Sequence, residues 1–161
     1  MKQLVYLGIL GILLSSCLGD RTVDNIQPTS TFEERLVRDQ EIIDAYLAEN
    51  DITAEIEEPN GLRYVLHEQG TGESPDENSN VAVRYEGTLL DSTVFDASDS
   101  IAFSLENVII GWRIGVPLLQ EGGSITLYIP SVFAYDLASP GAPVPPSANL
   151  IFDIELLKVL E

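Results

Sequence analysis

The sequence of 161 residues carries 26 acidic and 8 basic side chains, a formal net charge of −18. Nucleic-acid binding and attraction to anionic lipid head groups both depend on Lys and Arg, so this excess of acidic side chains argues against both kinds of binding. One histidine and one cysteine cannot supply the three or four nitrogen and sulfur ligands of a zinc site or an intramolecular disulfide. We therefore predict no metal, no cofactor and no nucleic-acid partner.

The N-terminal residues have the features of an export signal. Residues 1–3 supply one positive charge, residues 4–14 form an apolar run, and two serines precede Cys17. The run is about half the length that crosses a bilayer, which argues against a retained transmembrane helix. The segment 14–17 resembles the bacterial lipobox, which implies removal of residues 1–16 and lipidation of Cys17. We expect a cell-envelope protein held by this lipid alone, at the outer membrane or a periplasmic face.

A tether and a helix are expected next. Residues 17–30 offer little to bury and are predicted to be the tether. Within segment 31–58, described as a helix and linker, the helix begins at Thr31, which forms a capping-box pattern with Glu34, and ends at Asn50. Its apolar stripe at helical spacing consists of Phe32, Leu36, Ile42, Ile43, Tyr46 and Leu47. The stripe either packs against the rest of the chain or serves a dimer or client contact, and the sequence leaves both open.

Residues 59–161 are predicted to form one α+β domain. Four segments alternate apolar and polar residues, as half-buried strands do. Their inward-facing sets are Leu62, Tyr64 and Leu66; Val81, Val83, Tyr85 and Gly87; Ile125, Leu127 and Ile129; and Phe152, Ile154 and Leu156. Residues 107–119 are the best place for a short helix, broken by Gly115 and Pro117. The pattern indicates an antiparallel twisted sheet wrapped around one short helix.

Several separated motifs occur in this domain in an order typical of one family. They are Ser92-Thr93-Val94-Phe95-Asp96, Val108-Ile109-Ile110-Gly111-Trp112, Phe133-Ala134-Tyr135, Val144-Pro145-Pro146 and Leu150-Ile151-Phe152-Asp153-Ile154-Glu155-Leu156. Taken together they resemble the FKBP-type peptidyl-prolyl cis-trans isomerases. The resemblance implies the FKBP-like fold, proline-containing polypeptides as clients, and non-covalent acceleration of rotation about X-Pro bonds during the folding of exported proteins.

The resemblance also implies an apolar aromatic pocket. The residues that it assigns to catalysis are Tyr85, Phe95, Asp96, Trp112 and Tyr135. The residues that it assigns to substrate binding are Ile101, Val108, Ile109, Val144 and Phe152. In this scheme Trp112 is the floor beneath the proline ring, the Tyr135 hydroxyl and the Ile109 N–H bind carbonyl groups, and Asp96 is a polar group beside the pocket. From the residues alone, the alternative is that these side chains merely fill the core, and for Phe152 and Val108 the two interpretations are equal. For Trp112, which follows Gly111 and precedes polar Arg113, the pocket is favoured.

Three departures from the family pattern leave the level of activity open. Segment 97–101 is read as a shortened loop without the basic residue that commonly partners the aspartate, so Asp96 is expected to be less firmly held. Ile101 stands where an aromatic is usual, and Asp136 stands where glycine permits a left-handed backbone. A binding or chaperone module with weak or absent turnover is therefore the alternative, followed by an envelope scaffold. His67, the sole histidine, lies at a predicted strand end and is expected to have no catalytic role.

Overall fold

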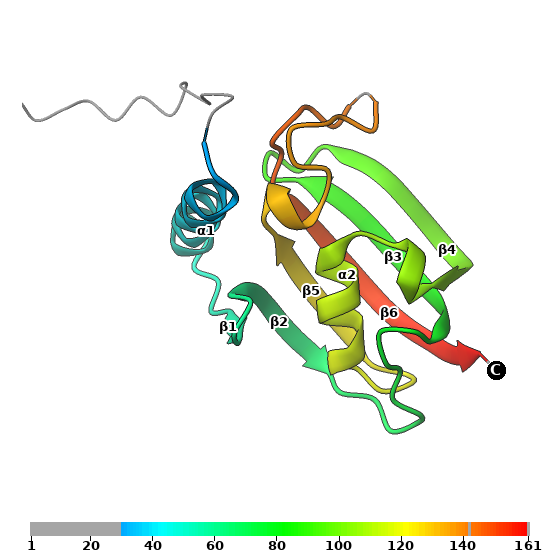
Figure 1. Cartoon of the computed structure of the whole chain (residues 1–161). Coiled ribbons are helices and arrows are strands. Elements are labelled where there is room, and N and C mark those ends of the chain that lie inside the picture. The colour runs from blue at the N-terminus through cyan, green and yellow to red at the C-terminus, as the bar shows by residue number, and fades with distance from the viewer. Residues whose placement is uncertain (1–29, 142, 161) are drawn as a thin grey trace, which may run out of the picture.

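The computed structural model describes residues 30–141 and 143–160, so the predicted leader, Cys17 and nearly all of the predicted tether lie outside it. Its helices and strands are α1 Phe32–Glu49, β1 Glu55–Glu57, β2 Leu62–Glu68, β3 Asn80–Leu89, β4 Val94–Ser104, α2 Ile110–Gly115, β5 Ser124–Ile129 and β6 Leu150–Leu160, with short 3-10 turns η1 Leu105–Asn107, η2 Val116–Leu118 and η3 Ser131–Phe133. The strands form one antiparallel sheet in the order β1-β2-β5-β6-β3-β4 (Figure 1). The predicted fold class is confirmed.

The short helix α2 crosses one face of the sheet, which we call the inner face (Figure 1). Two glycines let it approach closely. A Cβ atom on Gly111 would lie 2.5 Å from the side chain of Ile129, and one on Gly115 would lie 2.5 Å from that of Leu127. The predicted inward-facing sets of the strands meet α2 in one core, because alternate strand residues point to the same face.

The N-terminal helix α1 has the predicted start and end. The Thr31 side chain accepts a hydrogen bond from the Glu34 N–H at 3.2 Å, and the Glu34 carboxylate accepts one from the Thr31 N–H at 2.8 Å. This capping box satisfies two backbone donors that the first turn leaves without helical partners. The helix ends at Asn50, whose side chain donates to the Tyr46 carbonyl.

The C-terminal part of the apolar stripe of α1 packs on the outer face of the sheet, opposite α2. Ile43 and Leu47 are buried there with Tyr128 of β5 and Ile151 of β6, which alternate with the inner-face residues of those strands. Of the two roles that the sequence left open for the stripe, packing against the rest of the chain is therefore the one that its buried residues serve.

Three local details differ from the sequence-based expectation. Residues 97–101, expected as a loop, lie within β4 because they pair with β3 across a shift in register. The helix expected over 107–119 is split between α2 and η2, and Gly115 and Pro117 lie at that division. Strand β1 was not predicted, and the predicted domain boundary at residue 59 falls between β1 and its partner β2. Among the described residues, no helix combines the length and apolar character that a membrane span requires.

Candidate active site

A cavity of about 260 Å³ opens at the inner face of the sheet beside α2. Strands β3, β4 and β6, the segment from η1 to α2 and the turn after η3 contribute its lining. The lining residues are Tyr85, Asp96, Phe103, Asn107, Val108, Ile109, Trp112, Tyr135 and Phe152. Seven of the ten residues predicted for the pocket are thus brought together, and Phe103 and Asn107 are additions that the sequence reasoning missed.

Trp112 forms the centre of an aromatic cluster. Its side chain is 3% exposed, and it meets the rings of Tyr85, Phe103 and Phe152 edge-on, with centroid separations of 5.2, 5.6 and 5.3 Å and interplanar angles of 84° to 89°. Edge-to-face geometry is favourable because the positive ring edge meets the negative ring face. The indole Nε1 is buried with no hydrogen-bond partner among the described residues. Three crossed contacts fix the orientation of this ring and give the cavity a defined apolar wall.

Two predicted pocket residues lie behind the wall. Phe95 does not line the cavity, but its ring packs edge-on against Phe152 with centroids 5.4 Å apart. Val144 is buried in the same core and also lies outside the lining. Phe95 therefore supports the cavity wall through Phe152.

Ile101 requires a correction. Its side chain is 38% exposed and does not line the cavity, whereas Phe103, two residues further along β4, does and contacts Trp112. Ile101 and Phe103 pair with Val83 and Val81 of β3 in one register and so share a face of β4, but only the Phe103 ring meets Trp112. The aromatic edge that seemed to be lost is therefore present at Phe103. The signal that identifies it is the continuation of β4 to Ser104.

Asp96 is held by a neighbouring hydroxyl group. The Tyr85 O–H donates a hydrogen bond to Asp96 Oδ2 at 2.7 Å. Burial, together with this hydrogen bond and the Asp96 charge, raises the pKa of Tyr85 far above its ordinary value of 10.0. Burial and the Asp96 charge also raise the pKa of Tyr135. Both hydroxyl groups therefore stay protonated and able to donate at neutral pH, and Tyr85 supplies the partner that the sequence did not reveal for Asp96.

The residue that follows Tyr135 adopts the backbone conformation expected at a glycine position. Asp136 has φ = 51°, in the left-handed region that aspartate tolerates better than most residues. Its carboxylate accepts hydrogen bonds from Arg35 of α1, from Nε to Oδ1 at 3.0 Å and from Nη2 to Oδ2 at 2.9 Å. The turn that carries Tyr135 is thus tied to the N-terminal helix.

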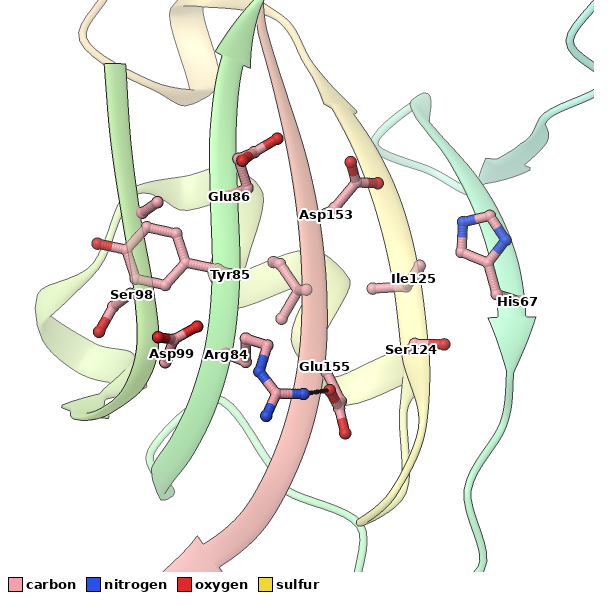
Figure 2. A pocket seen from close by; sticks show the side chains of 12 residues that line it. His67, Arg84, Tyr85, Glu86, Ser98, Asp99, Ser124, Ile125, Asp153 and Glu155 are labelled. Carbon is pink, nitrogen blue, oxygen red and sulfur yellow. Dashed lines mark hydrogen bonds and ion pairs between the residues drawn. The ribbon is translucent and has the colours of Figure 1, made fainter. Parts of the chain in front are cut away.

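A second hollow of about 450 Å³ lies on the outer face of the sheet (Figure 2). Two of its charged side chains, Arg84 and Glu155, pair with each other, as Figure 2 shows. His67 Nε2 lies 2.7 Å from Thr126 Oγ1, whose hydroxyl donates to Asp153. This chain of contacts joins β2, β5 and β6 through the buried Thr126. Within residues 30–141 and 143–160, no three potential metal-ligating side chains gather.

The fold and the inner pocket define a class of protein, and comparison with known families agrees. A family model described as FKBP-type peptidyl-prolyl cis-trans isomerase matches residues 71–157. The match covers more than half of the sequence. The chain belongs to the FKBP-type peptidyl-prolyl cis-trans isomerase family.

Particular relatives show how far the similarity extends. The chain is 46% identical over 103 residues to the probable FKBP-type peptidyl-prolyl cis-trans isomerase FkpA of Neisseria meningitidis serogroup B, covering 62% of this chain and 38% of that protein. It is 37% identical over 105 residues to the outer membrane protein MIP of Legionella longbeachae, covering 63% of this chain and 45% of that protein. The crystal structure of FkpA from Escherichia coli superposes with a TM-score of 0.67 at 36% identity, covering 79% of this chain and 60% of that one. The match thus spans less than half the length of these two curated relatives.

Proposed function

We propose that this protein is a peptidyl-prolyl cis-trans isomerase that binds proline-containing segments in the inner pocket and assists the folding of exported proteins. The observation that carries the proposal is the cavity itself. Trp112 is held edge-on by three aromatic rings, and the Tyr135 and Tyr85 hydroxyl groups lie in the same lining. An apolar floor with polar groups at one side matches the chemistry of a proline ring flanked by amide carbonyls.

The pocket chemistry suits rotation about an X-Pro bond. The barrier is about 18 to 20 kcal/mol because amide resonance keeps the bond planar. The planar amide is more polar than the twisted one, so replacing water with apolar walls destabilises the planar form relative to the twisted form. The Tyr135 hydroxyl is a protonated donor for a substrate carbonyl, and the Asp96 carboxylate, fixed by Tyr85, lies at the same cavity. No covalent intermediate is needed.

At each of the three departures from the family pattern, the structure contains a contact that compensates for the missing feature. Asp96 has a hydroxyl partner in place of a basic one. The aromatic edge expected at Ile101 is supplied by Phe103. The left-handed residue Asp136 is held by Arg35. These contacts support turnover over the alternative, a module that binds proline segments without catalysis.

The location and the anchor are part of the same proposal. The leader pattern supports export, lipidation of Cys17 and residence in the cell envelope, and one relative bears the name outer membrane protein MIP. Removal of residues 1–16 leaves seven basic against 26 acidic residues, which favours anchoring by lipid over contact with acidic head groups. Mass spectrometry of membrane-extracted protein should find an acylated Cys17 at the N-terminus. An intact Met1 would contradict this part of the proposal.

The experiment that tests the activity is the cis-to-trans conversion of a short X-Pro peptide in the presence of the wild-type chain without its leader. We expect a rate above background that is proportional to protein concentration and is inhibited by a competing proline peptide. Peptide binding without acceleration at high micromolar protein would establish the binding module instead. If the chain neither binds the peptide nor accelerates its conversion, the envelope scaffold is the hypothesis that remains.

A further inference from the structure

The first two turns of α1 contact the segment that carries Tyr135. The Phe32 ring lies 6.2 Å from that of Phe133, centroid to centroid. One turn later Arg35 binds Asp136, and one turn beyond that Asp39 binds Ser131. One helix edge therefore contacts residues 131–136 at three points, and Tyr135 lies within that range.

The Arg35–Asp136 pair is the contact nearest to the pocket. It is bidentate, and the Arg35 side chain is only 12% exposed, conditions under which an ion pair fixes geometry well. The Asp136 N–H donates to the Ser131 carbonyl at 2.7 Å, and the Asp136 carbonyl accepts from the Ser147 N–H at 2.6 Å. Asp136, the residue directly after Tyr135, therefore links α1, η3 and the segment that leads into β6.

The Asp39–Ser131 contact fixes the other end of the same segment. Asp39 is fully buried, and its carboxylate accepts from the Ser131 hydroxyl and from the Arg38 guanidinium. The Ser131 N–H in turn donates to Asn149 Oδ1 at 2.9 Å. A buried carboxylate is costly unless it is paired and hydrogen-bonded, so these partners favour one placement of the helix on η3.

Among the described residues of segment 131–149, Tyr135 is the one that lines the cavity. Residues on both sides of it are bound by α1, and hydrogen bonds weaken steeply with changes of distance and angle. We propose that Arg35 is a positioning residue, which acts through Asp136 to place the Tyr135 hydroxyl where it binds a substrate carbonyl. This inference rests on the proposed function, and it adds a residue of α1 to those on which substrate binding in the pocket depends.

The same helix provides a matched control. Asp44 of α1 accepts from Arg63 of β2 in an equally bidentate pair, with Nε–Oδ1 at 2.8 Å and Nη2–Oδ2 at 2.7 Å. The exposed fractions of the two arginines are close, 11% for Arg63 and 12% for Arg35. Neither Arg63 nor Asp44 lines the cavity. Breaking either pair should affect the attachment of α1 similarly, and only one of them lies beside the pocket.

The test compares R35A, R35K and R63A in the mature-length chain. Two readouts are needed: kcat/KM for an X-Pro peptide, and the Kd of a proline tetrapeptide from the fluorescence of Trp112, the single tryptophan. We expect R35A to lower kcat/KM about threefold to fivefold, a loss bounded by that of removing the Tyr135 hydroxyl. R35K should recover part of this loss, and R63A should change kcat/KM less than about twofold.

The decisive comparison is made in a Tyr135→Phe background. If Arg35 acts through the tyrosine hydroxyl, R35A should then lower kcat/KM by less than about twofold. The inference is overturned if R63A costs as much as R35A in wild type, or if the R35A loss persists in full without the hydroxyl. A wild-type chain with no turnover would refute the proposed function alone, because the same comparisons of Kd still test the placement of Tyr135.

Discussion

Replacing Trp112 with leucine removes the centre of the aromatic cluster and leaves a smaller apolar floor. Three edge-on contacts, each worth about 0.5–1.5 kcal/mol, are lost with Tyr85, Phe103 and Phe152. The substitution also removes a buried indole N–H that has no partner among the described residues, which offsets part of the loss by about 1–3 kcal/mol. We expect the free energy of unfolding to fall by about 1–3 kcal/mol.

In free energy, the effect of Trp112→Leu on the pocket should be comparable to its effect on the fold. A proline ring has three methylenes, and each contributes about 0.8 kcal/mol when buried. Without the indole floor most of that burial is lost, up to about 2.4 kcal/mol, and leucine recovers a part. We therefore predict that kcat/KM for an X-Pro peptide falls roughly tenfold to fiftyfold, with peptide affinity falling in parallel.

The assay combines peptide turnover, calorimetric titration of a proline peptide and thermal unfolding, with Leu119→Ala as the control. Leu119 is fully buried in the same core but does not line the cavity, and its truncation should cost about 2–5 kcal/mol of stability. Measured well below both unfolding midpoints, Leu119→Ala should keep kcat/KM within about twofold of wild type. If Trp112→Leu binds peptide as wild type does, or if Leu119→Ala loses as much turnover, the assignment of Trp112 as the pocket floor is incorrect.

Three further predictions use smaller perturbations. Tyr135→Phe removes one hydroxyl group, worth on the order of 1 kcal/mol, so turnover should fall less than tenfold; an unchanged rate would argue against its bond to a substrate carbonyl. Phe103→Ala should reduce peptide affinity while Ile101→Ala leaves it unchanged, and titration of both variants would expose a wrong choice between these positions. The pKa of the Tyr85 hydroxyl is raised in the folded state, so as the pH rises past about 10 this hydroxyl loses its proton in the unfolded chain before it does in the folded one. The free energy of unfolding, measured by urea titration, should therefore decline above that pH, and it should decline less steeply in Tyr85→Phe.

Local patterns in the sequence predict much of the fold. The capping box at Thr31 and the alternation through Ile125, Leu127 and Ile129 depend on neighbours a few residues away, so they are visible without the structure. Strand β1, with three residues, is too short to show a period. Seven of the residues taken from the family motifs line the cavity, and Phe103 lies there in place of Ile101 because tertiary packing decides which of two side chains on one face of β4 meets Trp112.

Long-range polar contacts were beyond local reasoning. Arg35 and Asp136 are 101 residues apart, and nothing in the sequence selects that partner among 26 acidic residues. The Tyr85–Asp96 bond crosses two neighbouring strands, and its existence depends on how β4 pairs with β3. The departures from the family pattern can be identified in the sequence. The contacts that compensate for them join residues that only the tertiary structure brings together.

The most direct test of the central claim is NMR exchange spectroscopy of an X-Pro peptide at equilibrium with a small amount of the mature-length protein. The cis and trans forms give separate signals, and uncatalysed exchange takes tens of seconds or more. We predict exchange cross-peaks between the two forms with wild-type protein, their strong reduction with Trp112→Leu, and a shift of the Trp112 indole proton when peptide is added. A shifted indole signal without exchange cross-peaks would contradict the proposed activity, because the pocket would then bind proline without accelerating isomerisation of the X-Pro bond.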